Sequence, residues 1–314
     1  MRAPPPHPIR QGHIGFLNRR KRGMSLSHPR PAVEAVHDPD TGTVTYLVSD
    51  PATSIAAVID PVLDYDPKAG RTDTHSAERL LDRIRARGLR VAWLLETHVH
   101  ADHLTAMAHL HRALGGQSGI GGQIEAVQLA FSDMFGFERD FHPDGTQFDH
   151  RFADGDTFAL GEIPARVLFT PGHTPACVSY LIGDAVFVGD TLFMPDSGTA
   201  RCDFPGGDAA ALYGSIRRLL ALPGETRMFV CHDYRPGGRP AAWETTVAEQ
   251  RAANIHIHDG VTEPAFVALR TERDRSLSMP VLMIPAVQVN IRAGELPPPA
   301  ANGVRYLQIP VNVL

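Results

Sequence analysis

A short apolar run followed by a cluster of metal-binding residue types constrains the fold of this chain more than any other feature. The run Val91–Leu95 is apolar at every position, which favours a β-strand that is covered on both faces. The segment 97–103, just after this run, reads Thr-His-Val-His-Ala-Asp-His. Because such a strand needs a helix or a second sheet on each side, we expect an α/β fold with its chemistry at the end of this strand.

The composition is that of a globular protein and excludes several other classes. Of 314 residues, 43% are hydrophobic and 21% are charged, so a large core can form and neither collagen nor wholesale disorder is expected. No apolar stretch approaches the roughly 20 residues that a membrane-spanning helix needs. The net charge of −5 gives no electrostatic basis for nucleic-acid binding. We therefore expect no membrane and no nucleic acid among the partners.

Three cysteines, Cys177, Cys202 and Cys231, are too few for a disulfide framework. Their odd number leaves at least one thiol free, which favours a reducing compartment and predicts a cytoplasmic protein. We expect none of them to be a catalytic nucleophile, because two lie in apolar, strand-like surroundings where a thiol is inert. The sequence leaves the oligomeric state open and is compatible with a homo-oligomer.

The amino-terminal segment differs from the rest of the chain. Residues 1–23 contain six basic residues and no acidic one. Its prolines and the absence of an apolar region or a small-residue cleavage site exclude a secretory signal. We interpret residues 1–31 as a disordered leader, with Met24 as an alternative start of translation. An organelle transit peptide is the competing interpretation, although the prolines would interrupt its amphipathic helix.

Strands and helices are predicted to alternate irregularly over residues 32–260. Short β-branched and apolar runs mark strands, whereas apolar residues spaced three or four apart after the N-caps Ser76 and Asp208 mark helices. The glycine-rich segment 115–122 lacks the pattern of a phosphate loop and is expected to be a connection. The predicted strands are 43–48, 54–60, 91–95, 166–170, 178–182, 185–189 and 226–231, and residues 243–254 are predicted to be helical.

Metal-binding residue types also follow three other predicted strands. His173, Asp190 and His232 each lie at or just beyond a strand end, which is where α/β sheets place their sites. Imidazole and carboxylate are the usual donors for first-row metals, and the spacing within 98–103 suits two neighbouring sites better than one tetrahedral site. The complete set of candidate metal-binding residues is His98, His100, Asp102, His103, His173, Asp190 and His232.

This ligand order resembles the metallo-β-lactamase superfamily, in which a His-x-His-x-Asp-His motif is followed by single His, Asp and His ligands. The resemblance covers about residues 40–258. It implies an α/β fold of the αββα four-layer sandwich type, with the metal at one edge between two sheets. We accordingly divide the chain into the leader (1–31), a catalytic domain (32–260) and a proline-rich C-terminal extension (261–314) that packs on it.

Local segments favour the persulfide dioxygenases of this superfamily over its zinc hydrolases. Ala101 stands before the motif aspartate, where glyoxalase II commonly has an aromatic residue, and segment 170–180 is similar to the dioxygenases. Segment 198–204 resembles their Gly-Cys-Gly-Arg-Thr-Asp-Phe, but departs from it at three positions. Segments 194–208 and 288–292 resemble a bacterial branch often labelled β-lactamase-like hydrolase.

The resemblance to persulfide dioxygenases implies one Fe(II) per chain, held by His98, His173 and Asp190. Two imidazoles and one carboxylate form a facial triad that leaves positions open for a persulfide sulfur and for O2. The implied reaction oxidises glutathione persulfide with O2 to sulfite and glutathione. The other four members of the set, His100, Asp102, His103 and His232, then orient ligands or substrate, or form a second metal site.

Two other interpretations are kept. The first is a dinuclear zinc thioester hydrolase of the glyoxalase II type, with two Zn(II) bridged by Asp190. The second is a non-catalytic relative that has retained the fold. For substrate contacts, Arg201 is the candidate for a glutathione carboxylate, and Tyr234 either donates a hydrogen bond to the substrate or covers the site. His256 and His258 alternate as strand residues do, and nothing in the sequence connects them with the site.

Overall fold

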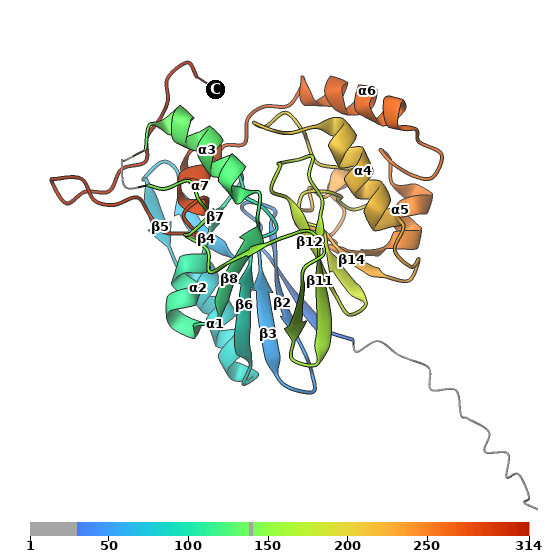
Figure 1. The fold of residues 1–314 in the computed structure, drawn as a ribbon, viewed down its shortest axis with the longest axis horizontal. Coiled ribbons are helices and arrows are strands. Elements are labelled where there is room, and N and C mark those ends of the chain that lie inside the picture. Colours follow the sequence, from blue (N-terminus) through green and yellow to red (C-terminus); the bar gives the residue numbers. More distant parts are fainter. Residues whose placement is uncertain (1–29, 138–140, 314) are drawn as a thin grey trace, which may run out of the picture.

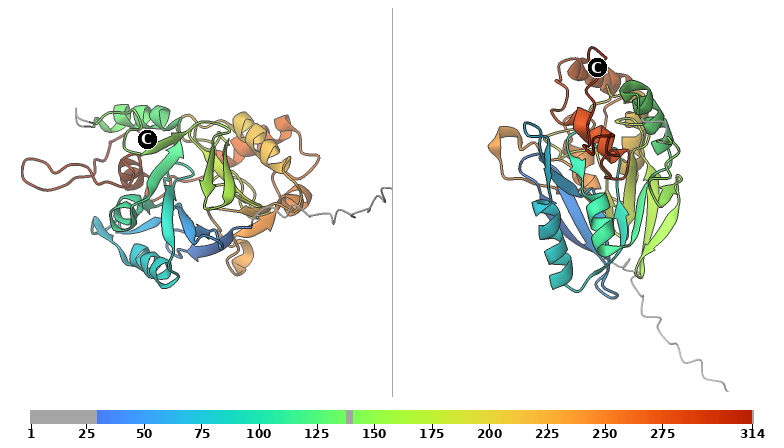
Figure 2. Two further views of the ribbon diagram at one scale, coloured as in Figure 1. Left: turned by 60° about the horizontal axis from the view of Figure 1, so that its bottom comes forward. Right: turned by 90° about the vertical axis from the view of Figure 1, so that its left-hand side faces the viewer.

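Two six-stranded sheets face each other, and helices cover both outer sides (Figures 1 and 2). The computed structural model describes residues 30–137 and 141–313. The first sheet has the order β1-β2-β3-β6-β8-β9 and the second the order β10-β11-β12-β13-β14-β15, while β5-β4-β7 form a small third sheet. This arrangement confirms the predicted αββα sandwich. Residues 1–29, on which most of the predicted leader falls, lie outside the described part.

The strands and helices have the following bounds. The first sheet contains β1 (Ala32–His37), β2 (Val44–Ser49), β3 (Ile55–Ile59), β6 (Arg90–Leu95), β8 (Gln117–Gly121) and β9 (His150–Phe152). The second contains β10 (Thr157–Leu160), β11 (Ile163–Phe169), β12 (Val178–Ile182), β13 (Ala185–Phe187), β14 (Arg227–Phe229) and β15 (Glu244–Thr246). The third contains β4 (Val62–Asp66), β5 (Arg71–Asp73) and β7 (Leu104–Thr105). The helices are α1 (His75–Ala86), α2 (Met107–Leu114), α3 (Ile124–Phe135), α4 (Ala209–Leu220), α5 (Val247–Ala253), α6 (Glu263–Asp274) and α7 (Met283–Asn290), with a 3-10 turn at Pro236–Gly238.

Strand β6 is covered on both faces, as its sequence predicts. Leu94 packs toward α1 and α2, and Leu95 belongs to the cluster between the two sheets. The aromatic centre of that cluster consists of Tyr46, Phe152, Tyr180, Phe187 and Phe229. β6 runs parallel to both of its neighbours, β3 and β8, so the loops after β3 and β6 leave the sheet at the same end.

The outer side of the second sheet is covered by α4, α5 and α6 (Figure 1). Leu212 and Ile216 of α4 pack with Phe266 of α6 in one buried cluster against this sheet. α3, α6 and α7 lie near the upper end of the two sheets in Figure 1. Within the described residues, no helix combines the length and the apolar character that crossing a membrane requires.

Two parts of the secondary structure differ from the sequence prediction because long-range pairing decides them. Segment 115–122, predicted to be a connection, contains β8, which pairs with both β6 and β9. Its glycines leave room for neighbours, since a Cβ at Gly119 would lie 2.7 Å from the ring of Phe152. Residues 244–246, predicted to be helical, form β15 against β14, and the helix begins only at Val247.

Local contacts account for two further corrections. The N-cap of α1 is Thr74 and not the predicted Ser76. Ser76 lies inside the helix, where its backbone N–H and its hydroxyl both donate hydrogen bonds to the Asp64 carboxylate. His256 and His258 do not lie in a strand but in the irregular segment after α5. The backbone N–H of His256 donates to the side-chain oxygen of Asn254, and that of His258 donates to the backbone oxygen of Asn254.

The residues after 260 pack on the remainder of the protein through two helices. α6 contacts α4, and α7 contacts β7. The division of the chain into a catalytic domain and an extension at residue 260 stays a prediction.

The N-cap of α4 provides a test of local stability. The Asp208 carboxylate accepts hydrogen bonds from the N–H groups of Ala210 and Ala211. We expect Asp208→Ala to lower the free energy of unfolding by about 1 kcal/mol in a denaturant titration, because two N-terminal donors lose their acceptor. Asp208→Asn retains an acceptor and should stay close to wild type; equal losses in both variants would contradict the capping role.

Candidate metal centre

The motif loop after β6 is fastened to the end of β3 by one buried carboxylate. Asp60 accepts hydrogen bonds from the backbone N–H of Thr97 (2.7 Å) and from its hydroxyl (2.9 Å). The second sheet approaches the same threonine, because Gly189 lies so close that a Cβ there would be 2.6 Å from Thr97 Oγ1. Both sheets therefore meet at the start of the motif.

His98, His173 and Asp190 converge at this junction. Each offers one donor atom, and the three atoms lie within 4.8 Å of one another. The side chains are almost fully buried, and His173 Nε2 is 3.7 Å from Asp190 Oδ2. His98 Nε2 and Asp190 Oδ1 have no hydrogen-bond partner. Buried polar atoms are rarely left unpaired, so converging unpaired donors of this kind fit a bound cation.

Hydrogen bonds turn the correct nitrogen of both imidazoles toward this point. His173 Nδ1 lies 2.8 Å from the backbone oxygen of Arg201, and because a carbonyl only accepts, Nδ1 carries the proton. The Thr97 hydroxyl donates to Asp60 and therefore accepts from His98 Nδ1 at 3.0 Å. In both rings Nε2 is left with a free lone pair, which is the form that binds a metal.

His100 lies between two buried carboxylates. Its Nε2 is 3.0 Å from Asp60 Oδ1 and 3.3 Å from Glu96 Oε2, while its Nδ1 has no hydrogen-bond partner. Burial alone would lower the pKa of His100, but the two carboxylates hold it well above its ordinary value. Burial raises the pKa of Glu96 to about 7, whereas burial lowers the pKa of His98, helped by neighbouring imidazoles.

The remaining candidates surround a second position beside the first. Asp102 Oδ2 accepts from the Thr43 hydroxyl (3.2 Å) and is 3.3 Å from His232 Nε2. His103 Nε2 and both ring nitrogens of His232 have no hydrogen-bond partner. His100, Asp102 and His103 form a second group whose donor atoms lie within 4.8 Å of one another. His100, Cys231 and His232 form a third.

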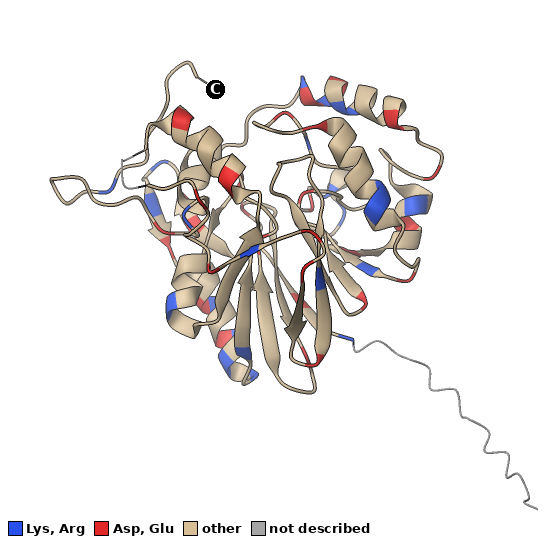
Figure 3. Cartoon of the chain, viewed as in Figure 1, with Lys and Arg blue, Asp and Glu red and all other residues tan. Residues whose placement is uncertain are grey.

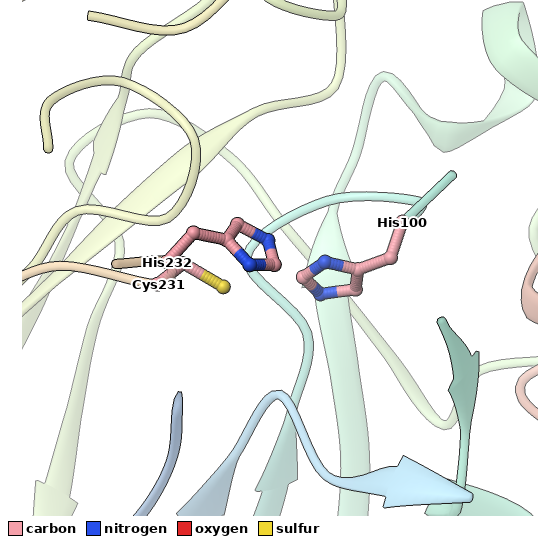
Figure 4. A group of neighbouring side chains, drawn as sticks. All are labelled: His100, Cys231 and His232. Atoms are coloured by element: carbon pink, nitrogen blue, oxygen red, sulfur yellow. The ribbon is translucent and has the colours of Figure 1, made fainter. Parts of the chain in front are cut away.

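The sulfur of Cys231 lies within 4.8 Å of a ring nitrogen of His100 and of His232. Figure 4 shows the Cys231 side chain and the His232 ring extending toward the ring of His100. Burial raises the pKa of the Cys231 thiol, and nearby carboxylates, Asp60 first, raise it further. Burial likewise raises the pKa values of Cys177 and Cys202 to about 12. Such thiols stay protonated and are poor nucleophiles.

Asn290 of α7 is a supporting residue that the sequence analysis did not identify. Its side-chain N–H groups donate to the backbone oxygens of His100 and His103, both at 2.8 Å. Its oxygen accepts from the N–H of Thr105, also at 2.8 Å. The backbone of the motif loop is thus hydrogen-bonded by a residue nearly two hundred positions later in the chain. Its polar side chain does not distinguish it from Gln288 of the same helix, so no local signal in the sequence marks this role.

A pocket of about 320 Å³ opens onto the site. Its lining includes Asp102, His173 and Asp190 of the site as well as Arg270 and Arg273 of α6. His256 helps to shape this wall, because its Nδ1 accepts a hydrogen bond from the N–H of pocket residue Thr199 (3.0 Å).

The two residues predicted to contact substrate both line this pocket. Arg201 already holds a partner, since Nε and one terminal nitrogen each donate to Asp203 at 2.6 Å. The other terminal nitrogen donates to the backbone oxygen of Ser278 (2.7 Å). The Tyr234 ring is 61% exposed and stacks on His232 with centroids 5.9 Å apart, which covers the second position. Their assignment to substrate binding stays a prediction.

Removing the Asn290 side chain tests whether α7 supports the motif. We expect Asn290→Ala to lower the free energy of unfolding by roughly 2–4 kcal/mol, because three buried backbone groups lose their partner. The measurement is a denaturant titration with a chelator present throughout, so that metal binding does not contribute. The control is Asn302→Ala, whose exposed side chain bonds only within its own loop; a similar small loss in both variants would contradict the supporting role.

Comparisons with known proteins agree with this geometry. The family model described as "Metallo-beta-lactamase superfamily" matches residues 38–232. A probable metallo-hydrolase of Burkholderia pseudomallei is 54% identical over 292 residues, which cover 90% of this chain and 99% of that protein. The "Glyoxylase B2" of Dictyostelium discoideum is 46% identical, with 90% and 97% covered. A "Beta-lactamase hydrolase-like protein" from Agrobacterium fabrum is 52% identical over 90% of this chain, and the match covers 65% of the length of that protein.

More distant similarity extends to persulfide dioxygenases. The human protein named "Persulfide dioxygenase ETHE1, mitochondrial" is 30% identical over 266 residues, covering 84% of this chain and 89% of that protein. The crystal structure of ETHE1 from Myxococcus xanthus superposes with a TM-score of 0.67 at 29% identity, covering 84% of this chain and 100% of that one. Together with the two facing sheets and the converging His and Asp side chains, these matches show that the chain belongs to the metallo-β-lactamase superfamily.

Proposed function

We propose that this protein is an iron-dependent persulfide dioxygenase that oxidises glutathione persulfide with O2 to sulfite and glutathione. The observation that supports this most directly is the convergence of His98, His173 and Asp190, whose donor atoms lie within 4.8 Å of one another. Two neutral imidazoles and one carboxylate are the donor set of a facial triad for non-haem Fe(II). Similarity to proteins named persulfide dioxygenase over most of the chain supports the same assignment.

The proposed reaction consumes one O2 and one water for each persulfide. Glutathione persulfide, O2 and H2O give glutathione, sulfite and two protons, and the terminal sulfur supplies the electrons that reduce O2. Ferrous iron, when bound by the triad, supplies open coordination positions for the sulfur and for O2. Its ligands contribute one negative charge, so the centre stays net positive and favours the anionic persulfide.

The residues of the chain orient the imidazole ligands and enclose the substrate in the pocket. Hydrogen bonds from His98 Nδ1 to the Thr97 hydroxyl and from His173 Nδ1 to the backbone oxygen of Arg201 fix the tautomers of these two rings. His173 and Asp190 border the pocket directly, so a substrate in the pocket reaches the triad from one side. Phe193, Phe204 and Tyr234 line the pocket with aromatic rings, which limits the access of water to the reacting sulfur.

A dinuclear zinc thioester hydrolase is the second candidate. The unpaired nitrogens of His103 and His232 favour it, as does the similarity to a protein named "Glyoxylase B2". In that case the seven candidate ligands would hold two Zn(II), with Asp190 available to both, and the metal would supply an activated water for thioester hydrolysis.

Metal content and oxygen consumption distinguish the two candidates. For protein purified without added metal, we expect about one iron per chain, uptake of one O2 per glutathione persulfide in an oxygen electrode, and formation of sulfite. S-lactoylglutathione should not be cleaved. Two zinc ions per chain with cleavage of S-lactoylglutathione and no oxygen uptake would establish the hydrolase instead.

Two substitutions separate the roles of the two metal positions. We expect His173→Ala to lower iron affinity by roughly 100-fold or more, because a direct ligand is lost, whereas His103→Ala should still bind one iron per chain when iron is in excess. Metal titration with mass spectrometry of the native protein gives both stoichiometries. If His103→Ala halves a wild-type content of two metal ions, the single-iron assignment is wrong.

A further inference from the structure

Three arginines line the pocket, and two of them are neutralised by carboxylates of the chain itself. Arg201 is paired with Asp203. Arg270 is only 2% exposed and donates to Asp274 (2.9 Å) and to the backbone oxygen of Thr199 (3.0 Å). These two arginines therefore hold the pocket wall in place and add no net charge to it.

The third arginine, Arg273 in the last turn of α6, is different. Its backbone oxygen accepts from Ser276, but its side chain is exposed and makes no hydrogen bond or ion pair with any residue in the described part of the chain. Its neighbours Glu272 and Arg275 pair with each other at 3.4 Å. Acidic and basic residues both occur along α6 (Figure 3), but the guanidinium that lines the pocket has all its donors available.

This distribution leaves one uncompensated positive charge on the pocket wall formed by α6. The nearby ring of His256 does not add to it, because burial and the charges of Arg270 and Arg273 lower the pKa of His256 to about 4. Leu277 and Pro280 beside Arg273 are apolar. A ligand that lies along this wall thus meets apolar surface and, in one place, a planar cationic donor suited to a carboxylate.

We propose that Arg273 binds a carboxylate of the thiol carrier and thereby selects carriers with an anionic group remote from the sulfur. This inference rests on the proposed function, which puts the sulfur at the triad. The triad ligands His173 and Asp190 and also Arg273 line the same pocket of about 320 Å³, so one ligand in it can contact both the metal position and Arg273. Arg201 does not replace Arg273 in this role, because its forked donors are already used by Asp203.

The test measures binding without turnover, using S-methylglutathione, a thioether that can be neither oxidised nor hydrolysed as a substrate. We expect Arg273→Gln to weaken its binding to the metal-loaded protein by roughly fivefold in calorimetry, the loss expected for one charge-assisted contact at a partly exposed site. Arg275→Gln, on the same helix but paired with Glu272, should bind like wild type. The KM for glutathione persulfide should rise in Arg273→Gln by a similar factor while kcat is retained.

Two ligand variants identify the carboxylate. If the glycine carboxylate is the partner, its ethyl ester should bind equally well to wild type and Arg273→Gln. If the γ-glutamyl carboxylate is the partner, S-methylcysteinylglycine, which lacks that residue, should show no difference between the two proteins. Either result supports the proposal and names the group.

Unchanged binding of S-methylglutathione to Arg273→Gln overturns the inference, as does an equal loss in Arg275→Gln. Failure of the proposed function has a separate signature, which is absence of oxygen uptake with glutathione persulfide. If binding depends on Arg273 but no oxygen is consumed, the carboxylate site is supported and the dioxygenase function is wrong.

Discussion

The arrangement of the metal centre depends on the buried carboxylate of Asp60 at the end of β3. It accepts two hydrogen bonds from Thr97 and faces His100 Nε2. Because the Thr97 hydroxyl is committed to Asp60, it accepts from His98 Nδ1, and Nε2 of His98 is left free. The same carboxylate engages Nε2 of His100 and leaves its Nδ1 free. One acidic side chain thus determines which nitrogen two neighbouring imidazoles present.

The centre also joins the two sheets. His98 and His100 follow β6 of the first sheet, whereas His173, Asp190 and His232 follow β11, β13 and β14 of the second. Six buried ligand atoms of the site have no hydrogen-bond partner among residues 30–137 and 141–313, namely His98 Nε2, His100 Nδ1, His103 Nε2, Asp190 Oδ1 and both nitrogens of His232. Unpaired buried polar atoms destabilise a folded protein, so we expect a bound cation to stabilise the junction of the sheets.

The sequence predicted the sandwich and the candidate ligands because local patterns mark the strand ends and carry the resemblance to the superfamily. The apolar run before the motif and the strand ends before His173, Asp190 and His232 can each be recognised within a few residues. Asp60 follows the same strand-end rule as Asp190 and could have been found with it. Asn290 and β8 could not, because each depends on a partner chosen from elsewhere in the chain, the motif backbone in one case and Phe152 in the other. The pairing of Arg201 with Asp203 was missed because a flexible surface arginine carries no local signal of its partner.

The segment after residue 260 has more influence on the site than its distance in sequence suggests. α7 supports the motif loop through Asn290, and α6 holds the pocket wall through the Arg270–Asp274 pair and its bond to Thr199. The ligand set itself is compatible with more than one metal chemistry, because it contains donors for either arrangement. The residues that distinguish one substrate from another therefore have to lie in the walls, to which α6 and the turn after it contribute Arg270, Arg273, Leu277 and Pro280. Differences in substrate among proteins with the same metal ligands are expected to be concentrated in this segment, where a change of side chain alters the pocket without disturbing the hydrogen bonds that orient the imidazoles.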